Sequence, residues 1–315
     1  MKPQTKKLIS ISVLIVLALL LAYYIKTTLS DFKKLTLVNP LFIIILIILF
    51  IFSYFTIGLI TKNLLKPLNV KLKGIEAFAL SIVTGFYNLI TPFRGGMATR
   101  AVYLKKKHDF SYTNFLATLA ASYILVFLIA SFLGLLSTYL IYLSEGIFSW
   151  ILFLIFLGLF LSLSFIVIFS PKFQETRYNF INNFIKVING WHLIKDDKRI
   201  IFIVSFLTLI QLLIGTLMLY LQFKVFGIEI DLIKCLFLVS IGNISMLFAI
   251  TPANLGVGEA ITVFSASTIG ITAIHSLSAT ILGRAISFLV LFILGPIFSY
   301  ILLKHNPKKQ ENEIK

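Results

Sequence analysis

Six apolar segments constrain this chain more than any other feature. A run of about 18 to 20 apolar residues is long enough to cross the hydrocarbon core of a bilayer as a helix. The six segments are Leu8–Ile25, Leu41–Thr61, Tyr112–Leu143, Phe148–Ser170, Ile200–Phe223 and Ser278–Leu303. Hydrophobic residues make up 59% of the 315-residue chain, which is too many for a soluble domain. We therefore expect an all-α integral membrane protein, a single polytopic domain over residues 1–315 with six full transmembrane helices.

Two further apolar segments end in residues that a spanning helix avoids. Gly74–Ile90 leads into Thr91-Pro-Phe-Arg-Gly-Gly-Met-Ala-Thr-Arg100, and Leu232–Ile250 leads into Thr251-Pro-Ala-Asn-Leu-Gly-Val-Gly-Glu259. Proline and glycine break the backbone hydrogen-bond ladder, and arginine is costly at the bilayer centre. We expect each segment to turn inside the membrane and to leave on the side from which it came, as a re-entrant helical hairpin.

The basic residues predict which side of the membrane each connection occupies. Lysines precede the first apolar segment, and lysines and arginines fill the connections 62–73, 94–107, 171–199 and 304–309. Because basic connections stay in the cytoplasm, we expect a multi-pass protein of the cell (plasma) membrane with cytoplasmic N- and C-termini. The second hairpin then enters from the outer face, opposite to the first. The same bias and contact with anionic lipid explain the net charge of +16, so we expect no nucleic acid as partner.

The two broken segments resemble each other at a constant offset. Ile90-Thr-Pro92 aligns with Ile250-Thr-Pro252, and Gly96 aligns with Gly256. Similar hairpins of opposite orientation are what an inverted-repeat transporter requires. We expect one repeat at about 74–170 and the other at about 232–303.

Residues 171–199 form the longest polar connection between these repeats. Apolar side chains recur in it at helical spacing between lysine, arginine and asparagine, namely Phe173, Phe180, Ile181, Phe184, Ile185 and Ile188. This pattern predicts an amphipathic helix on the cytoplasmic membrane surface. A plain solvated linker is the alternative.

The first break carries candidate phosphate ligands. Arg94 and Arg100 are separated by Gly95 and Gly96, so a turn there could aim both guanidinium groups at one phosphate while the glycines let backbone amides approach. The alternative is that both arginines extend to the cytoplasmic head groups and only orient the hairpin.

The second break carries an acid and its expected partner. Glu259 follows Gly256, and a buried carboxylate there needs a counter-charge, for which Arg284 in the last apolar segment is the obvious candidate. The pair is either static or broken and remade during transport. Asn254 and Asn88 are expected to cap the broken helices or to contact a head group. No metal-ligand cluster and no nucleophile–base motif occurs near the breaks, so we expect no cofactor.

These motifs resemble those of the lysylphosphatidylglycerol synthase transmembrane family. The resemblance rests on Pro92-x-Arg94-x-Gly96-x-x-x-Arg100, on Thr251-Pro252-x-x-Leu255-Gly256-Val257-Gly258-Glu259 and on the downstream Gly283-Arg284 and Gly295. It implies a membrane half that moves aminoacylated phospholipid between leaflets, here expected to stand alone without the soluble synthase domain. Met97 stands where the family usually has an acidic residue.

The sequence and the resemblance together favour a lipid flippase. Its substrate and partner would be an anionic or phosphate-bearing membrane lipid, either an aminoacyl-phospholipid or a polyprenyl-phosphate-linked carrier. Two alternatives stay open. The chain could be an accessory or regulatory subunit of a separate lipid-modifying enzyme, or a membrane-embedded lipid transferase such as a phosphatidylglycerol lysyltransferase.

Overall fold

The computed structural model is all helical in the part of the chain that it describes. The residues described are 37–170, 173–174, 176–177, 182, 185, 189, 191–248, 251 and 254–304. Five of their helices are long and apolar enough to cross a membrane. They are α2 (Leu41–Leu65), α5 (Tyr112–Glu145), α6 (Trp150–Phe169), α8 (Lys198–Val225) and α11 (Ala273–Lys304). The predicted first span, Leu8–Ile25, and most of the predicted amphipathic connection lie outside the described residues.

Capping residues mark several ends of the long helices. Ser111 caps α5 by accepting a hydrogen bond from the backbone N–H of Asn114, and Asp197 caps α8 through the N–H of Ile200. Helix α5 ends at Glu145, and the C-cap residue Gly146 has a φ of 70°, a left-handed conformation that glycine adopts without strain. The short polar cap residues therefore mark the boundaries between apolar runs and connections.

The two interrupted segments form pairs of shorter helices. The first hairpin consists of α3 (Gly74–Ile90) and α4 (Gly95–His108), with the 3-10 turn η2 (Pro92–Arg94) between them. The second hairpin consists of α9 (Leu232–Ile244) and α10 (Val257–Ser267), with η4 (Ser245–Phe248) after α9. Both breaks thus lie at the predicted proline-glycine sequences. Two further 3-10 turns, η1 (Lys66–Leu68) and η3 (Trp191–Leu193), lie in connections.

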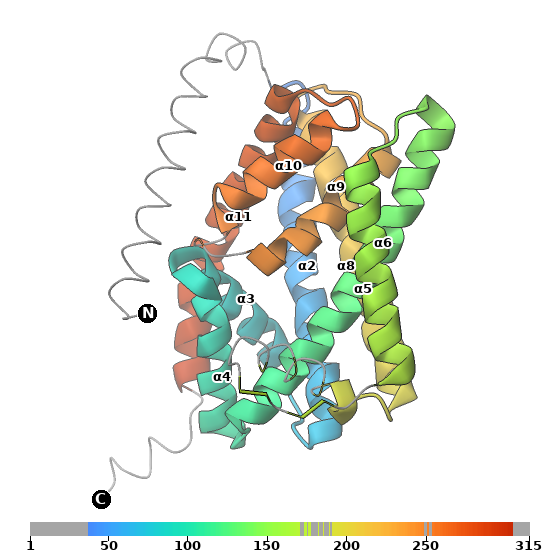
Figure 1. Ribbon diagram of the computed structural model, residues 1–315. Helices are drawn as coiled ribbons and strands as arrows, with labels where there is room; N and C mark the ends of the chain where they lie inside the picture. The colour runs from blue at the N-terminus through green and yellow to red at the C-terminus, as the bar shows by residue number, and fades with distance from the viewer. Residues whose placement is uncertain are drawn as a thin grey trace, which may run out of the picture.

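The two hairpins open toward opposite ends of the helix bundle (Figure 1). At one end, the connection before α3 and the end of α4 pack against the end of α11 through Leu72, Leu104 and Leu302. At the other end, Lys234 near the start of α9 forms an ion pair with Glu145 at the end of α5, with an Nζ–Oε2 distance of 2.8 Å. The two helix pairs therefore open at different ends of the bundle.

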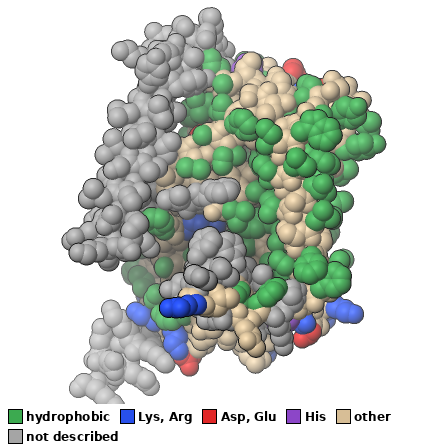
Figure 2. Space-filling model, in the orientation of Figure 1, with side chains coloured by type: hydrophobic (Ala, Val, Ile, Leu, Met, Phe, Trp, Pro, Cys, Tyr) green, Lys and Arg blue, Asp and Glu red, His purple; other side chains and the backbone are tan. Residues whose placement is uncertain are grey.

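Basic side chains gather at the end where the first hairpin opens, which we call the basic end. Figure 2 shows lysine and arginine side chains along this lower edge, whereas hydrophobic side chains cover much of the surface above it. The basic residues in the helix termini and connections there are Lys62, Lys66, Lys71, Lys73, Lys105, Lys106, Lys107, Lys195, Lys198, Arg199 and Lys304. Among the described residues, the opposite end instead carries Glu145, Glu229 and Asp231 beside Lys224 and Lys234.

Each long helix that follows a hairpin packs against the other hairpin. Helix α5, which follows the first hairpin, lies along α9 of the second, and α11, which follows the second, lies along α3 of the first. Helices α2 and α8, which precede the hairpins, pack against each other. Buried apolar side chains of α5, α6 and α9 form one core cluster, and those of α2, α3 and α11 form another. Because the long helix after each hairpin packs along the other hairpin, the two breaks lie together in the middle of the bundle.

Candidate functional site

The first break changes the chain direction through two left-handed residues. Helix α3 ends at Ile90; the hydroxyl of its C-cap residue Thr91 donates to the carbonyl of Tyr87, and Pro92 cannot continue the hydrogen-bond ladder. Phe93 and Arg94 then adopt φ values of 54° and 56°, which few non-glycine residues do. The chain re-enters helical geometry at Gly95, so Arg94 projects from the turn between the two arms.

Gly96 allows the two arms of the first hairpin to touch. A Cβ atom on Gly96 would lie 1.9 Å from the carbonyl oxygen of Thr84 and 2.8 Å from the backbone nitrogen of Asn88. A Cβ on Gly95 would lie 2.4 Å from the hydroxyl of Thr91. Both glycines thus serve close packing at the first break, Gly96 by letting α4 approach the backbone of α3 and Gly95 by making room for Thr91.

Two hydrogen bonds between residues of the second break stabilise its turn. Gly256 has a φ of 80° and precedes α10, whose third residue, Glu259, accepts a hydrogen bond from the Gly256 N–H at 2.7 Å. Thr251 donates its hydroxyl to the carbonyl of Leu255 at 2.7 Å. The glycine-acid spacing in the sequence therefore reflects a helix start.

The predicted partner of Glu259 is present. Arg284 on α11 donates from Nε to Glu259 Oε1 at 2.8 Å, with side-chain exposures of 26% and 10%. Since the other carboxylate oxygen accepts from Gly256, Glu259 connects α10 both to its own start and to α11. A charge pair inside an apolar bundle holds these elements in register.

A central cavity of about 200 Å³ lies where the two breaks meet. Arg94 and Asn88 line it from the first hairpin, Met246 and Asn254 from the second, and Arg284 from α11. Four of these five side chains are polar, in contrast to the apolar clusters on either side. Segments about 160 residues apart in the chain therefore supply one polar site, as in proteins whose ligand sites lie at a repeat interface.

Arg94 reaches into this region from the first hairpin. Its Nη1 donates to the hydroxyl of Tyr123 at 2.5 Å, and its guanidinium lies 5.4 Å from the centre of the Tyr123 ring. Its Nη2 lies 3.8 Å from the sulfur of Met246 on the second hairpin. Within the described part of the chain, no carboxylate lies within ion-pair distance of Arg94. A guanidinium held this way can accept an anionic group.

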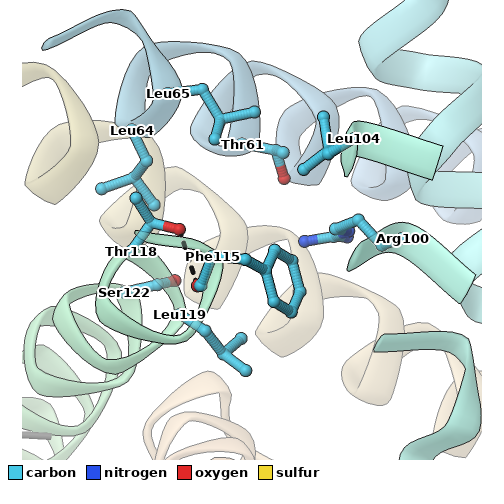
Figure 3. Close-up of a pocket in the computed structure, with 9 residues that line it drawn as sticks. All are labelled: Thr61, Leu64, Leu65, Arg100, Leu104, Phe115, Thr118, Leu119 and Ser122. Carbon is cyan, nitrogen blue, oxygen red and sulfur yellow. Dashed lines mark hydrogen bonds between the residues drawn. The ribbon is translucent and has the colours of Figure 1, made fainter. Parts of the chain in front are cut away.

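Arg100 lines a separate, smaller cavity (Figure 3). Its side chain is 8% exposed and donates from Nε to the hydroxyl of Thr84 at 3.1 Å. The guanidinium points into a space of about 30 Å³ between Thr61 on α2 and Phe115 on α5, with Ser122 on its far wall. Arg94 and Arg100 thus do not share one lining, because α4 carries the second arginine away from the turn. Arg100 also has no carboxylate within ion-pair distance among the described residues.

Asn88 and Asn254 do not cap helices. The N-cap positions of α4 and α10 are Arg94 and Gly256, and the C-cap of α3 is Thr91. Asn254 donates to the Ser245 hydroxyl at 3.3 Å, yet its Oδ1 and that of Asn88 are buried without a donor in the described structure. Buried amide oxygens without a hydrogen-bond donor are uncommon in folded proteins.

Comparison with protein families identifies the chain. A family model described as the lysylphosphatidylglycerol synthase TM region matches residues 8–295. The chain belongs to this lysylphosphatidylglycerol synthase TM family. The match spans both hairpins, the central cavity and the Arg100 cavity. Searches of curated proteins and of solved structures found no match.

Sequence reasoning missed several contributors to the site of this lysylphosphatidylglycerol synthase TM protein. Tyr123 on α5, Tyr54 on α2 and Met246 on η4 all contact or line the central cavity region. Each lies in or beside an apolar run, where aromatic and methionine residues are ordinary core or lipid-facing side chains. Only the hydroxyl of a tyrosine in mid-span could have signalled a polar neighbour. Within the described residues, no group of His, Cys, Asp and Glu could hold a metal ion.

Proposed function

We propose that this membrane protein moves a phosphate-bearing lipid head group between the leaflets of the plasma membrane. The observation that carries the proposal is the central cavity, in which Arg94 of the first hairpin and Arg284 beside the second hairpin line one space. Arginine binds phosphate oxygens through paired N–H donors. Membership in a lysylphosphatidylglycerol synthase TM family supports a role in lipid metabolism of the membrane.

The proposal includes an inverted repeat, which would give alternating access to this cavity. Helices α2, α3, α4 and α5 have the same order and relative lengths as α8, α9, α10 and α11. The exchanged packing of α5 on α9 and of α11 on α3 is what a two-fold relation between the halves would produce. We therefore place the start of each repeat at α2 and α8, one helix earlier than the sequence alone indicates.

The opposite directions of the hairpins give each leaflet its own gate. The first hairpin opens at the basic end, which in this scheme faces the cytoplasm in accord with the positive-inside bias. The second hairpin opens at the other end. In this scheme both are re-entrant, and displacement of one hairpin tip exposes the cavity to one leaflet while the other stays closed.

Leaflet exchange in proteoliposomes tests the proposal. Purified protein is reconstituted into vesicles containing a labelled anionic phospholipid, and the rate at which the label becomes accessible to an outside quencher is measured. Arg94→Gln removes the guanidinium from the cavity, and we expect the rate to fall by about tenfold or more, the effect of losing a charge-assisted hydrogen bond. Arg199→Gln, an exposed arginine at the start of α8, is the control and should leave the rate unchanged.

Two results would count against a transport role. Wild-type vesicles that exchange label no faster than protein-free vesicles would exclude it outright. Equal rates for wild type and Arg94→Gln would show that exchange does not pass through the central cavity. Because Arg94 has no carboxylate partner in the described structure, its replacement should not unfold the protein, and thermal unfolding in detergent verifies this.

A further inference from the structure

We propose that the Arg100 cavity is a binding site for one monatomic halide ion, with chloride as the occupant. The cavity lies between α2, α4 and α5, apart from the central cavity, and its residues have no part in the proposed transport step. The ion is a fixed structural ligand that joins the first hairpin to the helices beside it. The proposal therefore goes beyond the proposed function and can be tested without measuring transport.

Arg100 uses only part of its hydrogen-bonding capacity inside the protein. A guanidinium group carries five N–H donors and is always charged. Nε of Arg100 donates to the Thr84 hydroxyl at 3.1 Å, whereas the terminal nitrogens Nη1 and Nη2 have no acceptor among the described residues. The residue is only 8% exposed, so water outside the protein does not fully replace the missing acceptors. A buried charge in this state is costly, and an anion beside the terminal nitrogens would remove most of that cost.

The space in front of the guanidinium is the size of a small ion. Figure 3 shows the nitrogens of Arg100 pointing into the cavity between Thr61 and Phe115. Its volume is about 30 Å³, and about 10 to 15 Å³ is enough for one water molecule. The cavity therefore has room for a single halide ion with at most one water molecule. A phosphate group, with its four oxygens and the chain esterified to it, needs more space than this.

The donors of the cavity lie on opposite walls. Thr61 and Thr118 each donate the hydroxyl proton to a carbonyl of their own helix, at 3.0 and 2.8 Å. The Ser122 hydroxyl has no hydrogen-bond partner in the described structure and lies on the wall across from Arg100. An anion between them receives charged donors from α4 and a neutral donor from α5. A spherical ion sets no angular requirement on these donors, unlike a planar carboxylate.

The rest of the lining suits an anion that gives up water easily. None of the described lining residues is a carboxylate, and five are apolar, namely Leu64, Leu65, Leu104, Phe115 and Leu119. Lys62, Lys66 and Lys105 directly follow lining residues in the chain, so the cavity lies within the positive potential of the basic end. Such a potential raises the local concentration of anions. Chloride combines a single charge with weaker hydration than phosphate or sulfate, so it loses less on entering a half-apolar space.

Thermal unfolding of the full chain in detergent tests the site. Potassium chloride is compared with potassium gluconate at equal ionic strength, because gluconate is too large for the cavity. We expect chloride to raise the unfolding temperature of the wild type by about 2 to 4 °C, with saturation as the concentration increases. Arg100→Gln removes the charge and should abolish the chloride-dependent rise. Arg199→Gln removes an exposed arginine at the start of α8 and should keep it.

A second variant tests the cavity while leaving the charge of Arg100 in place. Ser122→Val removes the neutral donor and fills part of the space, so the chloride-dependent rise should again disappear. Equal chloride responses in the wild type, Arg100→Gln and Ser122→Val would overturn the proposal. Sulfate and phosphate stabilise proteins generally by exclusion from their surface, so they should raise all four unfolding temperatures alike. A phosphate response that depends on Arg100 and exceeds the chloride response would assign the cavity to an oxyanion instead, and would also overturn the proposal.

Bromide locates the ion directly, because it replaces chloride and scatters X-rays anomalously. Crystals of the full chain grown in bromide should show an anomalous peak within hydrogen-bond distance of an Arg100 terminal nitrogen and of the Ser122 hydroxyl. A cavity without such a peak would contradict the proposal. None of these measurements involves lipid exchange. Failure of the transport assay would therefore leave the ion site standing, and absence of the ion would leave transport through the central cavity standing.

Discussion

Arg94, Arg100 and Arg284 place guanidinium groups inside an apolar bundle in different ways. Arg284 is paired with Glu259, whereas Arg94 has a tyrosine hydroxyl and ring, and Arg100 has a threonine hydroxyl. Burying a charge without an opposite charge is costly, which bears most on Arg100, the buried one of the three. Under the proposed function, an anionic head group would offset this cost at Arg94, which lines the larger cavity.

The Glu259–Arg284 pair should show strong coupling in a double-mutant cycle. Removing one partner leaves the other charge buried, so we expect Glu259→Gln and Arg284→Gln each to lower the free energy of unfolding by about 3 kcal/mol. The double variant should lose less than the sum of the two, because neither charge remains. Thermal unfolding in detergent measures all four proteins.

The Lys105–Asp109 pair provides a matched comparison on the surface. Its Nζ–Oδ1 distance is 2.7 Å, but the side chains are 43% and 86% exposed. Solvent screening makes such a pair worth about 0 to 1 kcal/mol, so the effects of Lys105→Gln and Asp109→Asn should add. Additive effects at Glu259 and Arg284 as well would show that their contact does not hold the second hairpin.

The helices differ in how well the sequence specifies them. Long apolar runs predicted α2, α5, α6, α8 and α11 to within a few residues, because hydrophobic length alone decides such helices. The two breaks were also predicted, since proline and glycine disrupt the ladder wherever they occur. Helix α11 begins five residues earlier than the expected Ser278. The reason is that Ser276 and Ser278 bond carbonyl groups of their own helix and so enter it without loss.

The sequence could not predict which arginines line the same cavity. The directions of Arg94 and Arg100 depend on the two positive φ values at Phe93 and Arg94, and their spacing in the chain does not encode these. That Asn88 and Asn254 line the same cavity depends in turn on packing between segments far apart in sequence. Local patterns therefore gave the candidate residues of the site, while tertiary contacts decided how they are grouped.

The base of the first hairpin should be sensitive to acid. Glu76 at the start of α3 accepts hydrogen bonds from Tyr103, His108 and Lys107 near the end of α4, at 2.7 to 3.1 Å. Burial alone would raise the pKa of Glu76, but these bonds outweigh it and lower the pKa from 4.5 to about 2. The carboxylate therefore stabilises the folded state above pH 4.5, and this contribution disappears as the pH falls toward 2.

Unfolding temperatures at a series of pH values check this expectation. The wild type should lose stability progressively below about pH 4.5, and Glu76→Gln should be less stable at neutral pH and flatter across the acid range. Asp109→Asn, at an exposed acid next to the same hairpin, should keep the wild-type profile. A Glu76→Gln profile parallel to that of the wild type would show that this cluster does not fasten the hairpin.

For the bundle as a whole, the decisive property is that its two hairpins open at opposite ends. Single cysteines can report this in a Cys235→Ala background, since Cys235 is the chain's one cysteine. Asn69→Cys and Asp109→Cys flank the first hairpin, and Glu229→Cys and Ser267→Cys flank the second, all at exposed residues. We expect an impermeant maleimide added to intact cells to label the second pair only, and the first pair only after permeabilisation. Labelling of Asn69→Cys and Asp109→Cys from different sides would show that the first hairpin is not re-entrant.

The exchanged packing of α5 on α9 and of α11 on α3 bears on how the protein is made. Helix α3 ends at Ile90 and its partner α11 at Lys304, whereas α5 ends at Glu145 and its partner α9 at Ile244. The ribosome therefore completes each partner well after the helix against which it packs. Until then, lipid tails must cover the faces that these partners later occupy. Neither half can reach its native packing by itself, so assembly of the N-terminal half is completed only when synthesis of the C-terminal half is nearly over.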